Sequence, residues 1–213
     1  MLPRVVLIGG LVALAVAVAV TLAERGTREA GSNRIPAGQF VAQLPARRTL
    51  CQDGELVPGD SAGLKLTVGT YYRPGPPVRV TITRSGQPVA DGGLAAGWRQ
   101  GNHVRFPIAR VRRTTQASRV CLTNAGPATL ALGGSATADL PARVDGRRTP
   151  GRVRIEYVRP GRESWWSLLP TVSYRFGLGK APGLGAWTLA LAVGLALSAI
   201  GAAAWLVARA GAR

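Results

Sequence analysis

Short stretches in which apolar and polar residues alternate fill the middle of the chain, from Leu50 to Val158. Clusters of Gly, Pro, Asp and Asn separate these stretches, and such clusters form turns. Many short strands without an amphipathic helix predict an all-β ectodomain, an antiparallel β-sandwich of either jelly-roll or Ig-like topology. The clearest predicted strands are 64–71, 78–84, 103–111, 118–124, 128–132 and 152–158, with weaker ones around Cys51 and Val89.

The same alternation assigns an inward face to each strand, because residues two apart in a strand point to the same side of a sheet. The predicted core consists of Leu64, Leu66, Val68, Val78, Val80, Ile82, Val104, Phe106, Ile108, Val153, Ile155 and Tyr157.

Two apolar runs without a charged residue flank this region, at 5–23 and 185–208. As helices they would extend ~28 Å and ~36 Å, against about 30 Å for the hydrocarbon core of a bilayer. A helix buried in a soluble protein is the alternative, but a run of this length offers water no polar face. The first run is either an uncleaved anchor or a secretory signal cleaved after Ala23, and it is longer than most signals.

These patterns divide the chain into six parts and predict its place in the cell. The main domain is extracytoplasmic and attached to the cell membrane, with two passes, or one if the first segment is cleaved. The parts are an N-terminal transmembrane helix or signal anchor (1–23), a linker (24–48), the β-sandwich (49–158), a juxtamembrane interfacial segment (159–184), a C-terminal transmembrane helix (185–208) and a short cytoplasmic tail (209–213).

The segment before the last apolar run is rich in aromatic residues flanked by Arg and Lys, which is typical of a membrane interface. An alternative is that Trp165 and Trp166 pack beneath the sandwich. Pro170 is expected to divide the segment into two short pieces. The residues expected at the membrane interface are Trp165, Trp166, Tyr174, Phe176, Trp187 and Trp205.

Small residues recur every fourth position in the last apolar run, at Ala190, Gly194, Ser198 and Ala202. Such a face lets helices approach closely. It predicts packing on the first helix, on a second copy of the chain as a homo-oligomer, or on another membrane protein.

The chain is strongly basic, with a formal net charge of +17 at pH 7. Arg occurs three times between apolar residues in predicted strands, so its side chain points away from the core there. Guanidinium groups suit phosphates and carboxylates, so an anionic envelope polymer or a lipid headgroup is the expected ligand. The alternative is that these residues only solvate the sheet and protect its edges. Nucleic acid fits the charge but not an exported domain. The predicted basic face comprises Arg79, Arg105, Arg154, Lys65 and Arg119.

The two cysteines of the chain, Cys51 and Cys121, are predicted to form a disulfide if the domain is exported. Closing a loop of this size contributes ~4 kcal/mol. Trp98 lies in a Gly-rich connection, where it either stacks on a sugar ring or covers the end of its own core.

No motif of an enzyme, cofactor site or metal site is recognisable, so we expect neither catalysis, nor a cofactor, nor a bound metal. The chain has one His. Asp53, Glu55 and Asp60 form the one acidic cluster near a predicted loop, and their spacing matches no EF-hand, so a solvated turn is the expected role.

The alternating strands, the Trp98 loop and the paired cysteines resemble the jelly-roll accessory domains of bacterial cell-envelope membrane proteins, over Leu50 to Val158. No site residue follows from that resemblance. The predicted function is a non-enzymatic, membrane-anchored extracytoplasmic binding or accessory protein. The alternative is a structural subunit of an envelope assembly or transport complex, held together by its transmembrane helices.

Overall fold

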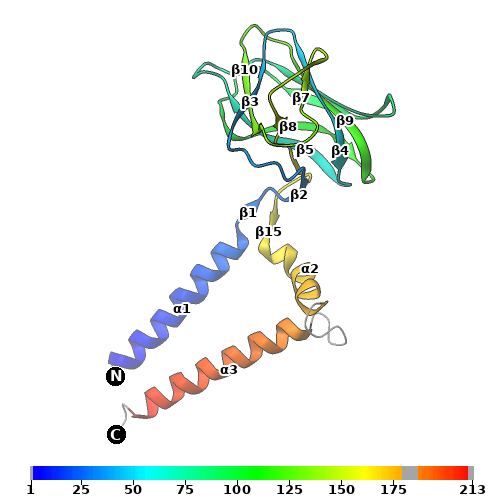
Figure 1. Cartoon of the computed structure of the whole chain (residues 1–213). Helices are drawn as coiled ribbons and strands as arrows, with labels where there is room; N and C mark the ends of the chain where they lie inside the picture. Colours follow the sequence, from blue (N-terminus) through cyan, green and yellow to red (C-terminus); the bar gives the residue numbers. More distant parts are fainter. Residues whose placement is uncertain (1, 179–186, 211–213) are drawn as a thin grey trace. The chain divides into compact units, whose positions relative to one another are not determined.

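The computed structural model describes residues 2–178 and 187–210. They form two compact units. The β domain is Thr27–Gly161, and the helical unit combines Met1–Gly26 with Arg162–Arg213. The β domain is all-β, as predicted, and its strands form a curled antiparallel sheet (Figure 1).

The strands of the β domain follow one another with short connections. They are β2 (Glu29–Ser32), β3 (Gln39–Leu44), β4 (Thr49–Val57), β5 (Ser61–Gly69), β6 (Val78–Arg84), β7 (Gln87–Leu94), β8 (Gly101–Val111), β9 (Thr115–Asn124), β10 (Leu130–Ser135), β11 (Arg143–Val144), β12 (Arg147–Arg148), β13 (Arg152–Val153) and β14 (Glu156–Val158).

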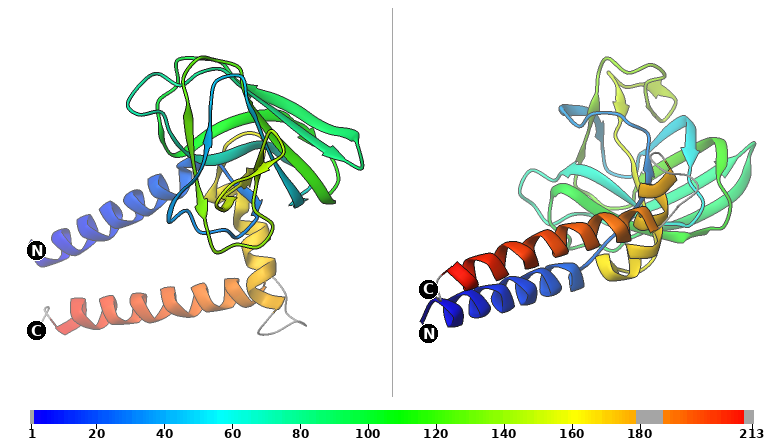
Figure 2. Two further views of the ribbon diagram at one scale, coloured as in Figure 1. Left: turned by 45° about the horizontal axis from the view of Figure 1, so that its top comes forward. Right: turned by 90° about the horizontal axis from the view of Figure 1, so that it is seen from below.

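Hydrogen bonding connects these strands in the order β12-β11-β4-β9-β6-β7-β8-β5-β10-β13. In addition, β3 pairs with β10, while β14 pairs with β5 and β2. The first half of the sheet runs from β12 to β7, and the second half contains β8 and the strands beyond it. Figure 2 shows the curl of the sheet, and the buried residues of its two halves form one core. The choice between a jelly-roll and an Ig-like topology stays a prediction.

The two halves join through a single pairing between Gly92 on β7 and Ile108 on β8. A Cβ atom at Gly92 would lie 2.2 Å from the Pro107 carbonyl oxygen and 2.6 Å from the Ile108 Cα. Only glycine therefore lets the two backbones approach closely enough to continue the sheet around this corner.

The core lies between the two halves and contains every residue that the alternation predicted to point inward. Leu44 on β3 and both Leu130 and Leu132 on β10 add to it. The inward positions that the period of two predicts are therefore confirmed. On β6 the alternating residues point toward solvent, whereas every residue of β14 is buried, so β14 has no solvent-facing side.

Residues 24–48 differ from the linker that the sequence predicts, since β2 and β3 belong to the sheet. The pairing of β3 with β10 shifts register between Leu132 and Gly133. On β3 the consecutive residues Val41 and Ala42 are both buried. A β-bulge of this kind removes the strict alternation by which a strand is recognised in a sequence.

The predicted disulfide is present. Cys51 and Cys121 are directly opposite each other on β4 and β9, with 4.1 Å between their Cα atoms. Leu50 and Leu122 beside them point into the core, so the disulfide lies on the outward face of the first half. This explains why Cys121 is out of phase with its apolar neighbours.

The helical unit contains α1 (Leu2–Ala23), the short pair β1 (Arg25–Gly26) and β15 (Glu163–Ser164), α2 (Trp165–Leu178) and α3 (Trp187–Ala210). Pro170 lies inside α2 and does not divide it, in contrast to the prediction. Its position near the start of the helix removes one backbone hydrogen bond, the one that would reach the Trp166 carbonyl. Over residues 2–178 and 187–210, no helix combines the length and the apolar character that a membrane span requires.

Candidate functional site

The five residues of the predicted basic face lie in two groups rather than on one face. Arg79 on β6 and Arg119 on β9 belong to the outward side of the first half. Lys65 on β5 and Arg105 on β8 are paired directly in the second half, and Arg154 lies just before β14. Strand neighbours in this fold cannot be read from the sequence, so the grouping was not predictable.

Most of these cations already have partners. Arg119 forms an exposed ion pair with Asp53, whereas Lys65 and Arg154 both bind Glu156, whose side chain is almost buried. Burial alone would raise the pKa of Glu156, but hydrogen bonds and charge from Lys65 and then Arg154 outweigh it and lower this pKa. The ion pairs with Glu156 therefore stabilise β14 against β5, although the three cations of this group outnumber its one carboxylate.

Trp98 covers one end of the core. Its Nε1–H donates to the Pro76 carbonyl oxygen at 2.7 Å, and its ring meets Phe106 edge-on with 5.8 Å between centroids. A Cβ atom on Gly75 would lie 2.1 Å from the ring, so Gly75 lies directly against it. This geometry corresponds to the core-covering role that the sequence left open, and it does not present the ring as a stacking surface.

The three acidic residues expected in one turn separate completely. Asp53 pairs with Arg119, and Asp60 accepts two hydrogen bonds from Arg110. The hydrogen bonds and then the charge of Arg110 lower the pKa of Asp60. Among the described residues, no group of His, Cys, Asp or Glu is arranged to hold a metal ion.

Glu55 is buried because β4 changes phase before it. Gly54 has a φ of +72°, and the pairing of β4 with β9 shifts register between Gln52 and Glu55. Gln52 and Glu55, three positions apart, therefore both point inward, while Leu56 is exposed. A strand with regular alternation would have placed Glu55 outside.

The buried Glu55 carboxylate accepts hydrogen bonds from four side chains. Gln52 Nε2 donates to Oε1 at 2.6 Å, and Arg152 Nη2 forms the ion pair with the same oxygen. Tyr157 OH donates to Oε2 at 3.3 Å, and Asn33 Nδ2 donates to Oε1 at 3.4 Å. Burial, followed by the charge of Glu55, raises the pKa of Tyr157 well above its ordinary value. This network joins β4, β13 and β14 and the residue after β2, and the Glu55 carboxylate at its centre is inaccessible to a ligand.

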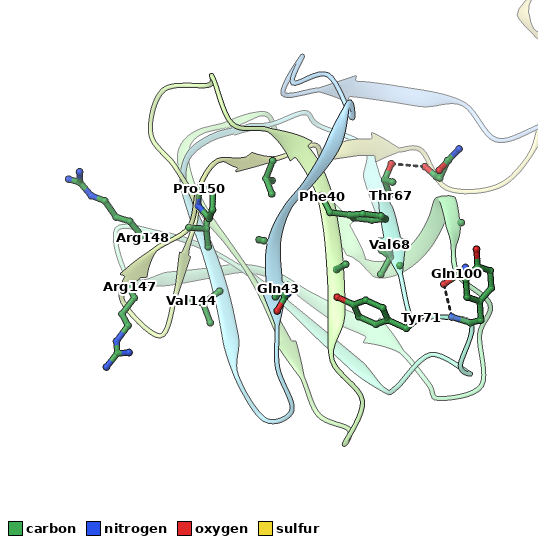
Figure 3. A pocket seen from close by; sticks show the side chains of 18 residues that line it. Phe40, Gln43, Thr67, Val68, Tyr71, Gln100, Val144, Arg147, Arg148 and Pro150 are labelled. Atoms are coloured by element: carbon green, nitrogen blue, oxygen red, sulfur yellow. Dashed lines mark hydrogen bonds between the residues drawn. The ribbon is translucent and has the colours of Figure 1, made fainter.

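The accessible site is an open groove of about 800 Å³ along the two ends of the curled sheet. β3 runs through the middle of the groove, with the end of β5 and the turn after it on one side and the β11–β12 hairpin on the other (Figure 3). Figure 3 shows the rings of Phe40 and Tyr71 on one side of β3, with Arg147 and Arg148 extending outward on the other side. No Asp or Glu occurs among the described residues that line the groove.

The aromatic end of the groove consists of Phe40, Tyr71 and Tyr72. Their exposed fractions are 58%, 57% and 94%, high for rings of this size. The Phe40 ring lies against Gly69, where a Cβ atom would approach it to 3.0 Å. The missing side chain of Gly69 therefore allows the ring to lie close to the strand.

A strained turn presents the two tyrosines. Tyr71 and Tyr72 have φ values of 54° and 63°, a left-handed conformation that costs roughly 1 kcal/mol or more for a non-glycine residue. Gln100 Oε1 holds the turn, accepting from the backbone N–H groups of Thr70 at 2.9 Å and Tyr72 at 3.1 Å. Strain maintained by a dedicated side chain is common at functional sites.

The arginine end of the groove consists of Arg147 and Arg148 on β12. Asp145 and Gly146, both at positive φ, make the tight turn before them. The Asp145 carboxylate is occupied elsewhere, since it accepts from Thr49 N and Arg48. The Thr49 hydrogen bond is the main cause that lowers the pKa of Asp145, and burial opposes it.

Positive charge at the arginine end is not neutralised within the described part of the chain. The structure gives neither the Arg147 nor the Arg148 side chain a hydrogen bond or ion pair there, and Arg148 is opposite Arg143 in the hairpin. Like charges directly opposite each other destabilise a strand pair. An anion bound here would relieve this repulsion.

Sequence reasoning did not identify the groove, because β3 lies in the predicted linker and β12 lies between two predicted strands. The Asp-Gly pair at 145–146 was a usable hairpin signal. Nothing in the sequence indicated that the two segments are neighbours.

The residues expected at a membrane interface and at a helix contact all lie in the helical unit. Trp165, Trp166 and Tyr174 on α2 and Trp187 and Trp205 on α3 are exposed, and Trp166 Nε1 donates to the Ala19 carbonyl. The Phe176 side chain, residues 179–186 and residues 211–213 lie outside the described part. The small residues at Ala190, Gly194, Ser198 and Ala202 are exposed on α3.

No protein-family model matches the chain, and no curated protein shows significant similarity to it.

Proposed function

We propose that the chain is a non-enzymatic, membrane-anchored extracytoplasmic protein whose β domain binds an anionic ligand of the cell envelope in the groove. The observation that carries the proposal is the pairing of exposed aromatic rings with two unneutralised arginines along a groove whose described lining has no carboxylate. Sites of this kind attract anions by charge and orient them by contact.

The disulfide supports the location outside the cytoplasm, because such bonds persist in oxidising compartments. Membrane anchoring is supported by the two chargeless runs at 5–23 and 185–208 and by the aromatic and basic residues before the second run.

The ligand part of the proposal is tested by binding of dextran sulfate to the full chain in detergent micelles, with uncharged dextran as the reference. We expect binding of dextran sulfate alone, weakened by salt. The variant R147Q/R148Q should lose roughly tenfold or more in affinity, since each lost charge-assisted hydrogen bond is worth about 1.5 kcal/mol or more. The matched control R79Q/R84Q removes the same charge from β6. Equal losses in both variants would mean that net charge, rather than the groove, binds the ligand.

The membrane part is tested by alkaline carbonate extraction of the chain from native membranes. Retention in the pellet, with release by detergent, is expected. Release by carbonate alone would overturn the anchoring proposal and leave the ligand proposal standing.

A second function, that of a subunit in an envelope assembly, is favoured by the small residues exposed on α3. If it holds, a membrane protein should co-purify in mild detergent, and G194I/S198I should abolish its capture. The R147Q/R148Q variant should leave that capture unchanged.

A further inference from the structure

We propose that the ligand of the groove is an acidic polysaccharide, with a sugar ring stacked on the aromatic end and an acidic substituent of a neighbouring sugar held at the arginine end. This inference rests on the proposed function and specifies its ligand class.

The aromatic end fits the face of a sugar ring. A pyranose presents C–H groups on one face, so covering Phe40 and Tyr71 with it removes apolar surface from water on both partners. Both rings have more than half of their surface exposed in the free protein. Tyr72, almost fully exposed, adds a third ring at the same end.

Polar residues among the lining of the groove suit hydroxyl groups. Gln43 on β3 and Asn102 on β8 both line the groove, and an amide both donates and accepts hydrogen bonds. A sugar hydroxyl needs both capacities. Ionised carboxylates, which only accept, are missing from the described lining and would repel an acidic chain.

The arginine end requires a charged substituent. Guanidinium groups bind carboxylate, sulfate or phosphate in a bidentate manner. Because Figure 3 shows the arginines on the opposite side of β3 from the two rings, one monosaccharide does not account for both ends. A polymer that crosses β3 does.

An acidic peptide added as a strand along the edge of β3 is the competing ligand. Such addition needs a regular row of free backbone groups. The β3 edge is only six residues long, is interrupted by the bulge at Val41, and is followed by Pro45. Bulges and prolines are the features that protect edges from strand pairing, so the observations favour the glycan.

The groove is also preorganised, which reduces the entropy lost on binding. Gln100 fixes the turn that carries both tyrosines. On the other side, Thr149 Oγ1 donates to the carbonyls of Ala142 and Gly151 and so secures the hairpin. Gln100 is therefore a positioning residue for the aromatic end.

The test measures binding of three probes to the full chain in detergent micelles by isothermal titration calorimetry. Alginate is an acidic polysaccharide, poly-L-glutamate is an acidic polypeptide, and dextran is a neutral polysaccharide. We expect alginate to bind at least about tenfold more tightly than either of the other two, since only alginate engages both ends. The variant F40A/Y71A should weaken alginate binding by roughly fivefold or more while leaving any poly-L-glutamate binding unchanged.

Gln100→Ala should reproduce part of the F40A/Y71A effect on alginate without changing its dependence on salt, because charge is untouched. The substitutions at Phe40 and Tyr71 affect exposed side chains, so an unchanged unfolding midpoint confirms that each variant is folded. Equal binding of alginate and poly-L-glutamate, both insensitive to F40A/Y71A, would overturn the glycan inference and leave a general anion site. Failure of alginate, poly-L-glutamate and dextran sulfate alike would overturn the proposed function as well.

Discussion

Removing the positive charge from the buried network of the β domain should unfold it far more readily than removing an exposed one. Arg152 Nη2 donates to Glu55 and to the Asp53 carbonyl at 2.8 Å, and its Nη1 donates to the Leu140 carbonyl at 3.1 Å. The side-chain exposures of Arg152 and Glu55 are 9% and 0%. Arg152→Met therefore leaves a buried carboxylate without its counter-charge, which costs about 3–5 kcal/mol.

Arg119→Met is the matched control, because it removes the same groups from an ion pair whose side chains are 58% and 50% exposed. An exposed pair contributes up to about 1 kcal/mol. Hydrogen exchange followed by mass spectrometry on the full chain in detergent is a suitable assay, because the central strands β6 and β9 exchange through global opening. Exchange there should accelerate by about two to four orders of magnitude in Arg152→Met and by less than about fivefold in the control.

Similar acceleration in the two variants would refute the reasoning that burial makes the Arg152–Glu55 pair critical. The double variant R152M/E55M separates the remaining explanations. If the loss comes from an uncompensated charge, removing both partners should recover much of it. If the double variant is as unstable as Arg152→Met, the loss of stability comes instead from the Leu140 and Asp53 carbonyl groups that no longer accept a hydrogen bond from Arg152.

Other predictions concern acid, the disulfide and the corner of the sheet. The pKa values of Asp60, Asp145 and Glu156 are lowered in the folded state. These carboxyls therefore stabilise the folded state at pH values above their ordinary pKa values. That stabilisation disappears as pH falls through the lowered values, so the urea midpoint should drop below about pH 4 and should drop less in Lys65→Met. The C51S/C121S variant should lose ~4 kcal/mol in urea unfolding, and a reducing agent should then have no further effect. Gly92→Ala should cost about 1–3 kcal/mol by forcing β7 away from β8, whereas Gly86→Ala, where a Cβ meets no atom but φ is positive, should cost about 1 kcal/mol.

The strand pattern was largely readable from the sequence because burial on one face leaves a period of two. Val78, Val80 and Ile82 on β6 illustrate this, and their predicted strand has the bounds of the observed one. The disulfide was also predictable, since two cysteines have one possible pairing within the chain. The strand pattern depends only on neighbouring residues, and the cysteine pairing has only one possibility, so neither requires knowledge of the tertiary structure.

The buried network around Glu55 could not be predicted from the sequence, because the sequence does not indicate which of its polar residues meet. Glu55 reads as part of an acidic turn until Gly54 reverses the phase of β4. The compensating Arg152 is distant along the chain and meets Glu55 only in the folded β domain. The apolar residues Val153 and Ile155 predicted that Arg154 between them points outward. Nothing in the sequence indicated that Arg152 points inward.

The sequence by itself determined the all-β class, the inward face of the central strands, the paired cysteines and the two apolar runs that flank the domain. Each follows from the period of a strand, from a single possible pairing or from the cost of exposing apolar side chains to water. The order of strands, the curl at Gly92 and the meeting of β3 with the β11–β12 hairpin were decided only by the tertiary structure. Hydrogen bonding between strands does not depend on how far apart the strands are along the chain. The sequence therefore did not indicate that the segments that form the groove become neighbours in the folded sheet.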